Sequence, residues 1–83
     1  MPDITWTPAR RSAEISFLRV EAERCDAARE DARNTADDPN ARPADRDFSR
    51  RAITAHQDNA DHYRATAHAL ESGADPVELG YTS

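Results

Sequence analysis

Residues 37–45 read DDPNARPAD, and this stretch decides the fold because it must interrupt a helix. Pro39 and Pro43 lack the amide hydrogen that a helix interior needs, and each disfavours helical geometry in the residue before it. The acidic residues and the asparagine around them compete for backbone hydrogen bonds, as turn residues do. The segment therefore predicts a turn at about residues 37–44.

Both stretches that flank the turn have the apolar spacing of a long helix. Residues 8–36 contain no glycine and no proline after Pro8, and one stripe recurs there in steps of three and four: Ile15, Leu18, Ala22, Cys25, Arg29, Ala32 and Ala36. Residues 45–72 carry a second stripe, consisting of Ile53, His56, Ala60, Tyr63, Ala67 and Leu70. The sequence predicts an all-α protein, an antiparallel two-helix hairpin closed along an alanine-rich, coiled-coil-like seam.

The helix ends carry recognisable signals. Thr7 followed by proline predicts a capped helix start, because the threonine oxygen can accept from a free amide and proline has no amide to leave unpaired. The second helix is expected to begin near Pro43 or at an Asp45 cap, and to stop at Gly73. Residues 75–78 read DPVE, a capping-box pattern that predicts a short helical turn at about 75–79.

Folding the second helix back on the first pairs the two stripes so that residue numbers add to 85. Large residues then face small ones in most layers, as close helix packing requires. The predicted layers are Ile15 with Leu70, Leu18 with Ala67, Ala22 with Tyr63, Cys25 with Ala60, Arg29 with His56, and Ala32 with Ile53. The polar layer of Arg29 and His56 is expected to specify the register, or to hold an arginine paired with Asp26 or Glu30.

Length and composition limit what this chain can do. Its 83 residues give room for a single domain, and with 16 alanines and 33% charged residues it has few large apolar side chains for a core. We therefore expect help from a second copy, which would make a four-helix bundle, or from a protein partner.

Composition also bears on location and origin. The single cysteine cannot form an intramolecular disulfide, and no apolar run resembles a signal peptide or a membrane span, so a cytoplasmic protein is expected. Eleven arginines without a lysine indicate a GC-rich genome, such as that of an actinobacterium or one of its phages.

A second apolar face lies on the first helix. Ala13, Phe17, Val20 and Ala27 point about 120° or more away from the seam, where the second helix cannot reach them. Both chain ends lie opposite the turn, at what we call the open end. The candidate protein-binding residues gather there: Trp6, Phe17, Val20, Val77, Leu79 and Tyr81. Either the tails fold over Phe17 and Val20 to complete a monomer, or another chain covers them.

The sequence offers little for catalysis or metal binding. A thiolate-imidazole pair of Cys25 and His56 is conceivable, but a packed, inert cysteine explains the seam position better. The three histidines, at positions 56, 62 and 68, fall on different helix faces and cannot chelate together. No catalytic residue, metal site, cofactor or small-molecule substrate is expected.

Nucleic-acid binding is a weaker alternative, because the net charge of −5 opposes it. Arg10 and Arg11 could contact phosphate, since positive charge at a helix start is otherwise unfavourable. An acidic run on the same helix could instead imitate a phosphate backbone, but arginines interleave with it and favour pairing within the helix: Glu21, Glu23, Asp26, Glu30 and Asp31. The sequence favours a non-enzymatic interaction protein over an accessory or mimic of nucleic acid.

Overall fold

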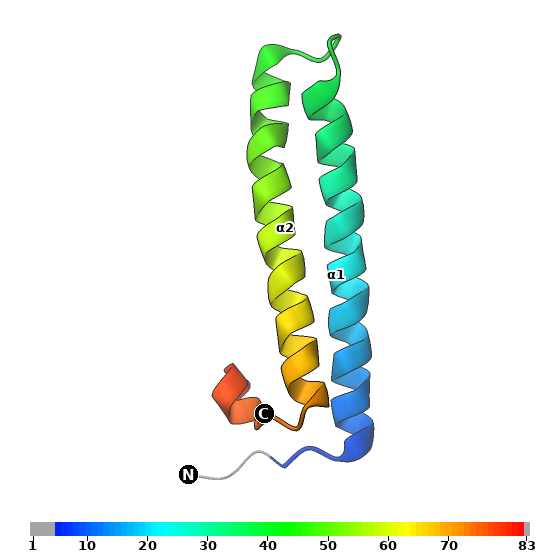
Figure 1. The fold of residues 1–83 in the computed structure, drawn as a ribbon, viewed down its shortest axis with the longest axis vertical. Helices are drawn as coiled ribbons and strands as arrows, with labels where there is room; N and C mark the ends of the chain where they lie inside the picture. The colour runs from blue at the N-terminus through cyan, green and yellow to red at the C-terminus, as the bar shows by residue number, and fades with distance from the viewer. Residues whose placement is uncertain (1–4, 83) are drawn as a thin grey trace.

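The computed structural model describes residues 5–82 and shows a two-helix hairpin (Figure 1). Helix α1 spans Pro8–Asp37, helix α2 spans Pro43–Glu71, and a short 3₁₀ helix, η1, spans Pro76–Leu79. No strand occurs in the described residues. The hairpin is a rod of 54 × 22 × 16 Å. The predicted all-α hairpin is confirmed.

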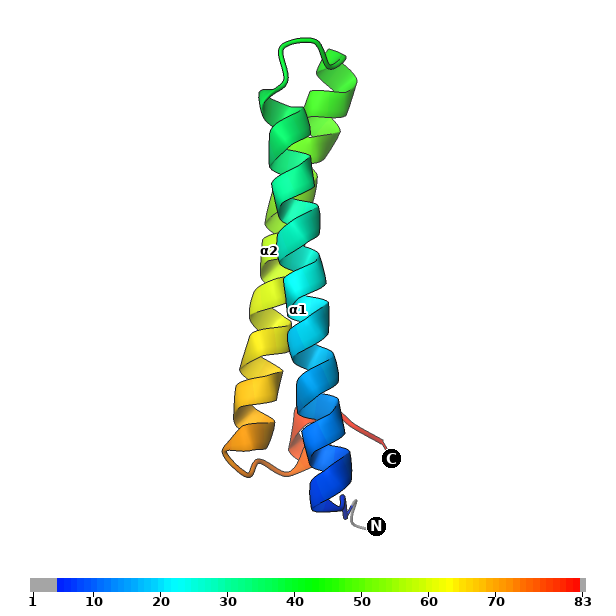
Figure 2. The ribbon, with the colours of Figure 1, turned by 90° about the vertical axis from the view of Figure 1, so that its right-hand side faces the viewer.

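The two helices run side by side in opposite directions and cross slightly when seen from the side (Figure 2). The start of α1 and the C-terminal segment both lie at the end opposite the turn (Figures 1 and 2). This is the open end expected for an antiparallel hairpin. The segment that carries η1 turns back there beside the ends of both helices.

Both long helices start at positions that their sequence signals indicate. The Thr7 hydroxyl accepts from the amide of Arg10 at 3.1 Å. Helix α2 begins at Pro43, the first of the two starts expected for it, and not at an Asp45 cap. The reason is that proline already has the backbone angle of a first helical residue and needs no amide partner. Asp45 falls in the first turn, where it accepts from Arg42 Nε at 2.9 Å.

The C-terminal segment is ordered by two glycines and one cap. Gly73, after the end of α2, and Gly80, after η1, both have a φ of 93°, a conformation that suits glycine because it has no Cβ. The Asp75 carboxylate accepts from the amide of Val77 at 3.0 Å and so caps η1. These features fold the tail back onto the open end.

The predicted seam matches the burial pattern. All thirteen residues of the two stripes are buried or half-buried, and none is exposed. Leu18 and Ala67, which the register pairs, lie in the same buried cluster. Ala36 and Ser49, whose numbers also add to 85, are both buried, as one further layer of that register would require.

The core is concentrated at the open end. Its buried cluster consists of Leu18, Ala67 and Leu70, and five partly buried residues pack against it: Trp6, Ile15, Tyr63, Leu79 and Tyr81. Towards the turn the buried residues are small, Ala36 and Ser49. The open end is therefore the well-packed part of the rod.

Candidate functional site

Three of the six candidate binding residues serve as internal support. Trp6, Leu79 and Tyr81 pack against the core cluster. The rings of Trp6 and Tyr81 meet edge to face, with centroids 4.8 Å apart and planes at 72°. The guanidinium of Arg10 lies 4.6 Å from the centroid of the Trp6 ring, within the range of a cation–π interaction. The two tails are thereby tied to each other and to α1.

Tyr81 is also anchored by its hydroxyl, which donates to Glu14 Oε2 at 2.6 Å. Burial of the phenol and this hydrogen bond to a carboxylate raise the pKa of Tyr81 to about 12. Both causes favour the neutral phenol, because ionisation would place a second negative charge beside Glu14. The tail is therefore held by a hydrogen bond that persists at neutral pH.

The two arginines predicted as nucleic-acid contacts both engage the protein. Nη1 of Arg11 donates to the carbonyl oxygens of Leu70 and Ala74, at 2.9 Å each. The last carbonyls of a helix have no partner within it, so a cation placed there satisfies them and opposes the negative end of the helix dipole. Arg11 thus joins the start of α1 to the end of α2, while Arg10 covers Trp6.

The other three candidate residues remain accessible. Phe17 is 55% exposed, Val20 45% and Val77 42%. Of the two alternatives, coverage by the tails or by another chain, the described parts of the tails do not supply the first, because they leave Phe17 and Val20 exposed. The reason is that the tail residues Trp6, Leu79 and Tyr81 pack against the core cluster, and so lie beside Phe17 and not over it.

Phe17 stands between two hollows at the open end. The first, of about 350 Å³, is lined by Trp6, Arg10, Ala13, Glu14, Phe17 and Tyr81. The second, of about 270 Å³, lies between α1, α2 and the tail, and we call it the open-end hollow. Its lining consists of Glu14, Phe17, Leu18, His62, Tyr63, Thr66, Leu79, Gly80 and Tyr81. Glu14, Phe17 and Tyr81 belong to both linings.

Phe48 is not among the predicted binding residues, yet it is the most exposed large apolar side chain within residues 5–82, at 72%. It lies near the turn, in a hollow of about 390 Å³ whose other lining residues are Arg51, Ala52, Ala55 and His56. The available signal was the register itself. Extending it by one layer places Ser49 in the seam, and the residue before it must then point to the side of the hairpin.

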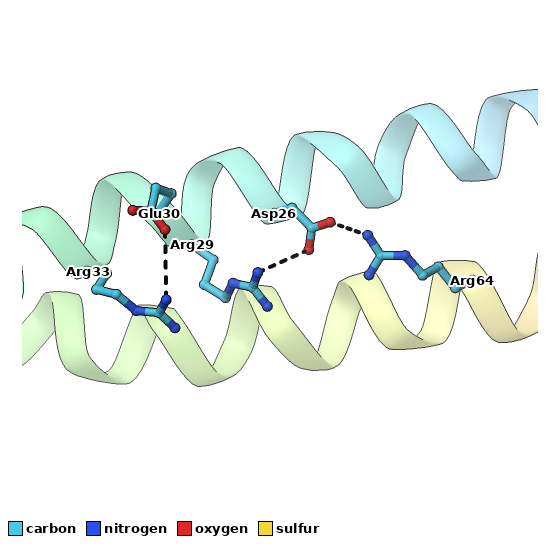
Figure 3. A network of polar contacts seen from close by, with 5 residues as sticks. All are labelled: Asp26, Arg29, Glu30, Arg33 and Arg64. Carbon is cyan, nitrogen blue, oxygen red and sulfur yellow. Dashed lines mark hydrogen bonds and ion pairs between the residues drawn. The ribbon is translucent and has the colours of Figure 1, made fainter.

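One long side of the hairpin is joined by ion pairs across the two helices, and Figure 3 shows the one between Arg64 and Asp26. Arg64 of α2 reaches Asp26 of α1, and this hydrogen bond raises the pKa of the arginine further. Arg19 of α1 pairs likewise with Glu71 of α2. Each of these four residues directly follows a seam residue, so they all point to the same side, which we call the charged face.

Charges also pair within α1. Arg29 lies 3.7 Å from Asp26, which confirms one of the partners expected for this seam arginine (Figure 3). Arg24 pairs with Glu21 at 2.9 Å, three residues away. Arg33 pairs in the same way with Glu30 at 3.8 Å (Figure 3). The predicted intrahelical pairing is confirmed, and it interrupts the acidic run that could have imitated a phosphate backbone.

Within residues 5–82 the structure shows no group of three or more histidine, cysteine or acidic side chains placed to hold a metal ion. Cys25 and His56 are both half-buried at the seam. Neither long helix has, in its described residues, a stretch apolar enough to cross a membrane.

No protein family, curated protein or solved structure matched this chain when it was compared with them. Its function must therefore be argued from its own surface.

Proposed function

We propose that this hairpin is a non-enzymatic protein-interaction module that docks a protein partner or a second copy through its open end, with Phe17 at the centre of the contact. The observation that carries the proposal is the placement of Phe17, more than half exposed between two hollows. Aromatic side chains that are surrounded by concave, partly apolar surface are typical centres of protein interfaces. Val20 and Val77 would extend the contact.

The support beneath Phe17 favours binding. Tyr81 lines both hollows and is fixed by Glu14 and by the edge of Trp6. A partner that meets such a surface does not have to order it first, and this lowers the entropic cost of association. In its finer form, the proposal is a small acidic subunit or modulator of a larger assembly, encoded by an actinobacterium or one of its phages, with a net charge of −5.

The test is co-purification of the tagged protein from its native cell, with wild type compared with Phe17→Asp. A matched control is Ser16→Asp, which adds the same charge to an exposed position one residue away. We expect a defined partner to be retained by wild type and by the control and lost with Phe17→Asp. Adding the purified partner should also change the fluorescence of Trp6, the only tryptophan. Retention of every partner by Phe17→Asp would refute the proposal.

A further inference from the structure

We infer that the open end receives Phe48 of a second copy, in a dimer of two hairpins packed face to face in opposite directions. This inference rests on the proposed function, because it names the partner and the side chain that fills the open-end hollow. It also adds a second contact surface, at the turn.

Phe17 and Phe48 lie on the same side of the hairpin. Phe48 precedes the buried seam residue Ser49, and Thr66 precedes the buried seam residue Ala67, so Phe48 and Thr66 share one side of α2. Thr66 lines the open-end hollow together with Phe17. The side opposite the charged face therefore carries an exposed phenylalanine at each end.

That side differs between its two helices, and we call it the apolar face after its α2 half. Its α1 half also carries charged residues: Glu14, Glu21, Arg24 and Asp31. On α2 it consists of the residues that precede the seam, and none of them is acidic or an arginine: Phe48, Ala52, Ala55, Asn59, His62, Thr66 and Ala69. The residues that follow the seam include the charged partners Arg64 and Glu71. A partner on the apolar face would therefore meet little charge on α2, and the free-energy cost of desolvating the α2 half of this face would be low.

The spacing along α2 would bring Phe48 of one copy to the open-end hollow of the other. Phe48 and Thr66 are eighteen residues apart, or about 27 Å along the helix. A two-fold axis across the apolar face near Ala28 exchanges these positions, so each Phe48 meets Thr66 and the open-end hollow of its partner. A parallel dimer would instead set hollow against hollow, and Phe48 would face the turn end of α1 of the other copy. The antiparallel arrangement is the one that fills both hollows.

Opposite charges would also meet across the antiparallel interface. In the antiparallel dimer α1 lies against α1 of the second copy, and Ala28 meets its own counterpart. Arg24 and Asp31 flank Ala28 on the same side of α1, at distances of four and three residues. Each Arg24 therefore falls beside Asp31 of the other copy, and the pair occurs twice. In a parallel dimer both residues would face the uncharged row of α2, so charge complementarity favours the antiparallel form.

The available area is sufficient. A face of 54 × 22 Å has a footprint of about 1,200 Å², and stable interfaces bury roughly 800 Å² on each partner. Burial of this face would also place a large side chain, Phe48, in a buried environment near the turn, where the buried seam residues are small.

The test is the mass in solution, measured by light scattering and sedimentation equilibrium across a micromolar dilution series. Wild type should sediment as a dimer of the 9.2 kDa chain, and Phe48→Asp should weaken self-association at least about 30-fold, the effect of losing a dominant contact. Phe48 is largely exposed, so this variant should keep its helical circular dichroism. Gln57→Asp, at an exposed position that follows the seam, is the matched control and should dimerise as wild type does.

A charge exchange tests the direction of packing. Arg24→Asp and Asp31→Arg should each weaken the dimer, because each places like charges together, and the double variant should restore it. A monomeric wild type, a dimeric Phe48→Asp, or a double variant weaker than both single variants would overturn the inference. If a different protein is captured through Phe17 and is unaffected by Phe48→Asp, the proposed function stands and the dimer does not.

Discussion

At the scale of single residues, a few polar side chains decide how the tails are held. Tyr81 joins the C-terminal segment to Glu14 of α1, and Arg11 joins the start of α1 to the carbonyls at the end of α2. Each contact spans more than fifty residues of sequence, so no local pattern could have indicated it. Arg10 and Arg11 looked like phosphate contacts because basic residues at a helix start are unfavourable. In the structure, Arg10 lies over the Trp6 ring and Arg11 donates to carbonyls at the end of α2. These contacts offset the unfavourable positive charge at the helix start.

The Tyr81 contact predicts a specific dependence on pH. Its pKa is raised from 10.0 to about 12 in the folded protein, so the neutral phenol stabilises the fold fully below pH 10, and this contribution is lost as the pH rises from 10 towards 12. In Tyr63→Phe, where Tyr81 is the only tyrosine, tyrosinate absorbance should appear near pH 12. Glu14→Gln should lower that midpoint only in part, because burial is the larger cause. A midpoint at the ordinary tyrosine value in Tyr63→Phe would contradict the assignment.

At the scale of elements, the alanine seam sets how closely α1 and α2 approach. Ala22 and Ala60 are each 1% exposed, and the register places them opposite Tyr63 and Cys25. Small side chains there let larger ones from the other helix fill the space between the backbones. The start of α2 is also decided within the element. It lies at Pro43, because the backbone angle of proline suits a first helical residue, and this preference outweighs a cap by Asp45.

Enlarging one seam alanine should force the helices apart. Ala60→Leu is expected to lower the free energy of unfolding by about 1–3 kcal/mol, the usual effect of overpacking a tight core. Ala65→Leu is the matched control, because Ala65 is exposed on the same helix and the substitution is identical. Thermal or urea unfolding followed by circular dichroism measures both. An Ala60→Leu protein as stable as the control would mean that the seam is looser than the burial indicates.

At the scale of the whole molecule, the rod is packed unevenly, with its large buried residues at the open end and small ones towards the turn. The charged face ties the helices together along one side, and the apolar face leaves Phe17 and Phe48 exposed on the other. Exposed ion pairs contribute little to stability, typically below about 1 kcal/mol each. The fold therefore depends on the small open-end core.

The hairpin should be sensitive to a single cavity in that core. Leu70 has 0% exposure and lies in the buried cluster, so Leu70→Ala is expected to lower the free energy of unfolding by about 2–5 kcal/mol. A domain of this length has roughly 4–12 kcal/mol in total. Urea unfolding should show the loss, and Val77→Ala, at an exposed position, should change little. A Leu70→Ala protein with unchanged stability would show that the core lies elsewhere.

The sequence by itself determined the two helices, the turn between them and which residues of each helix form the seam. Each of these depends on contacts that are local or repeat with the helix period, so spacing and turn chemistry are enough to indicate them. Only the tertiary structure decided which bulky residues became support and which stayed exposed. Trp6, Leu79 and Tyr81 pack on the core while Phe17 and Phe48 do not, because this depends on where the folded tail comes to rest, and no helical periodicity describes the path of a tail.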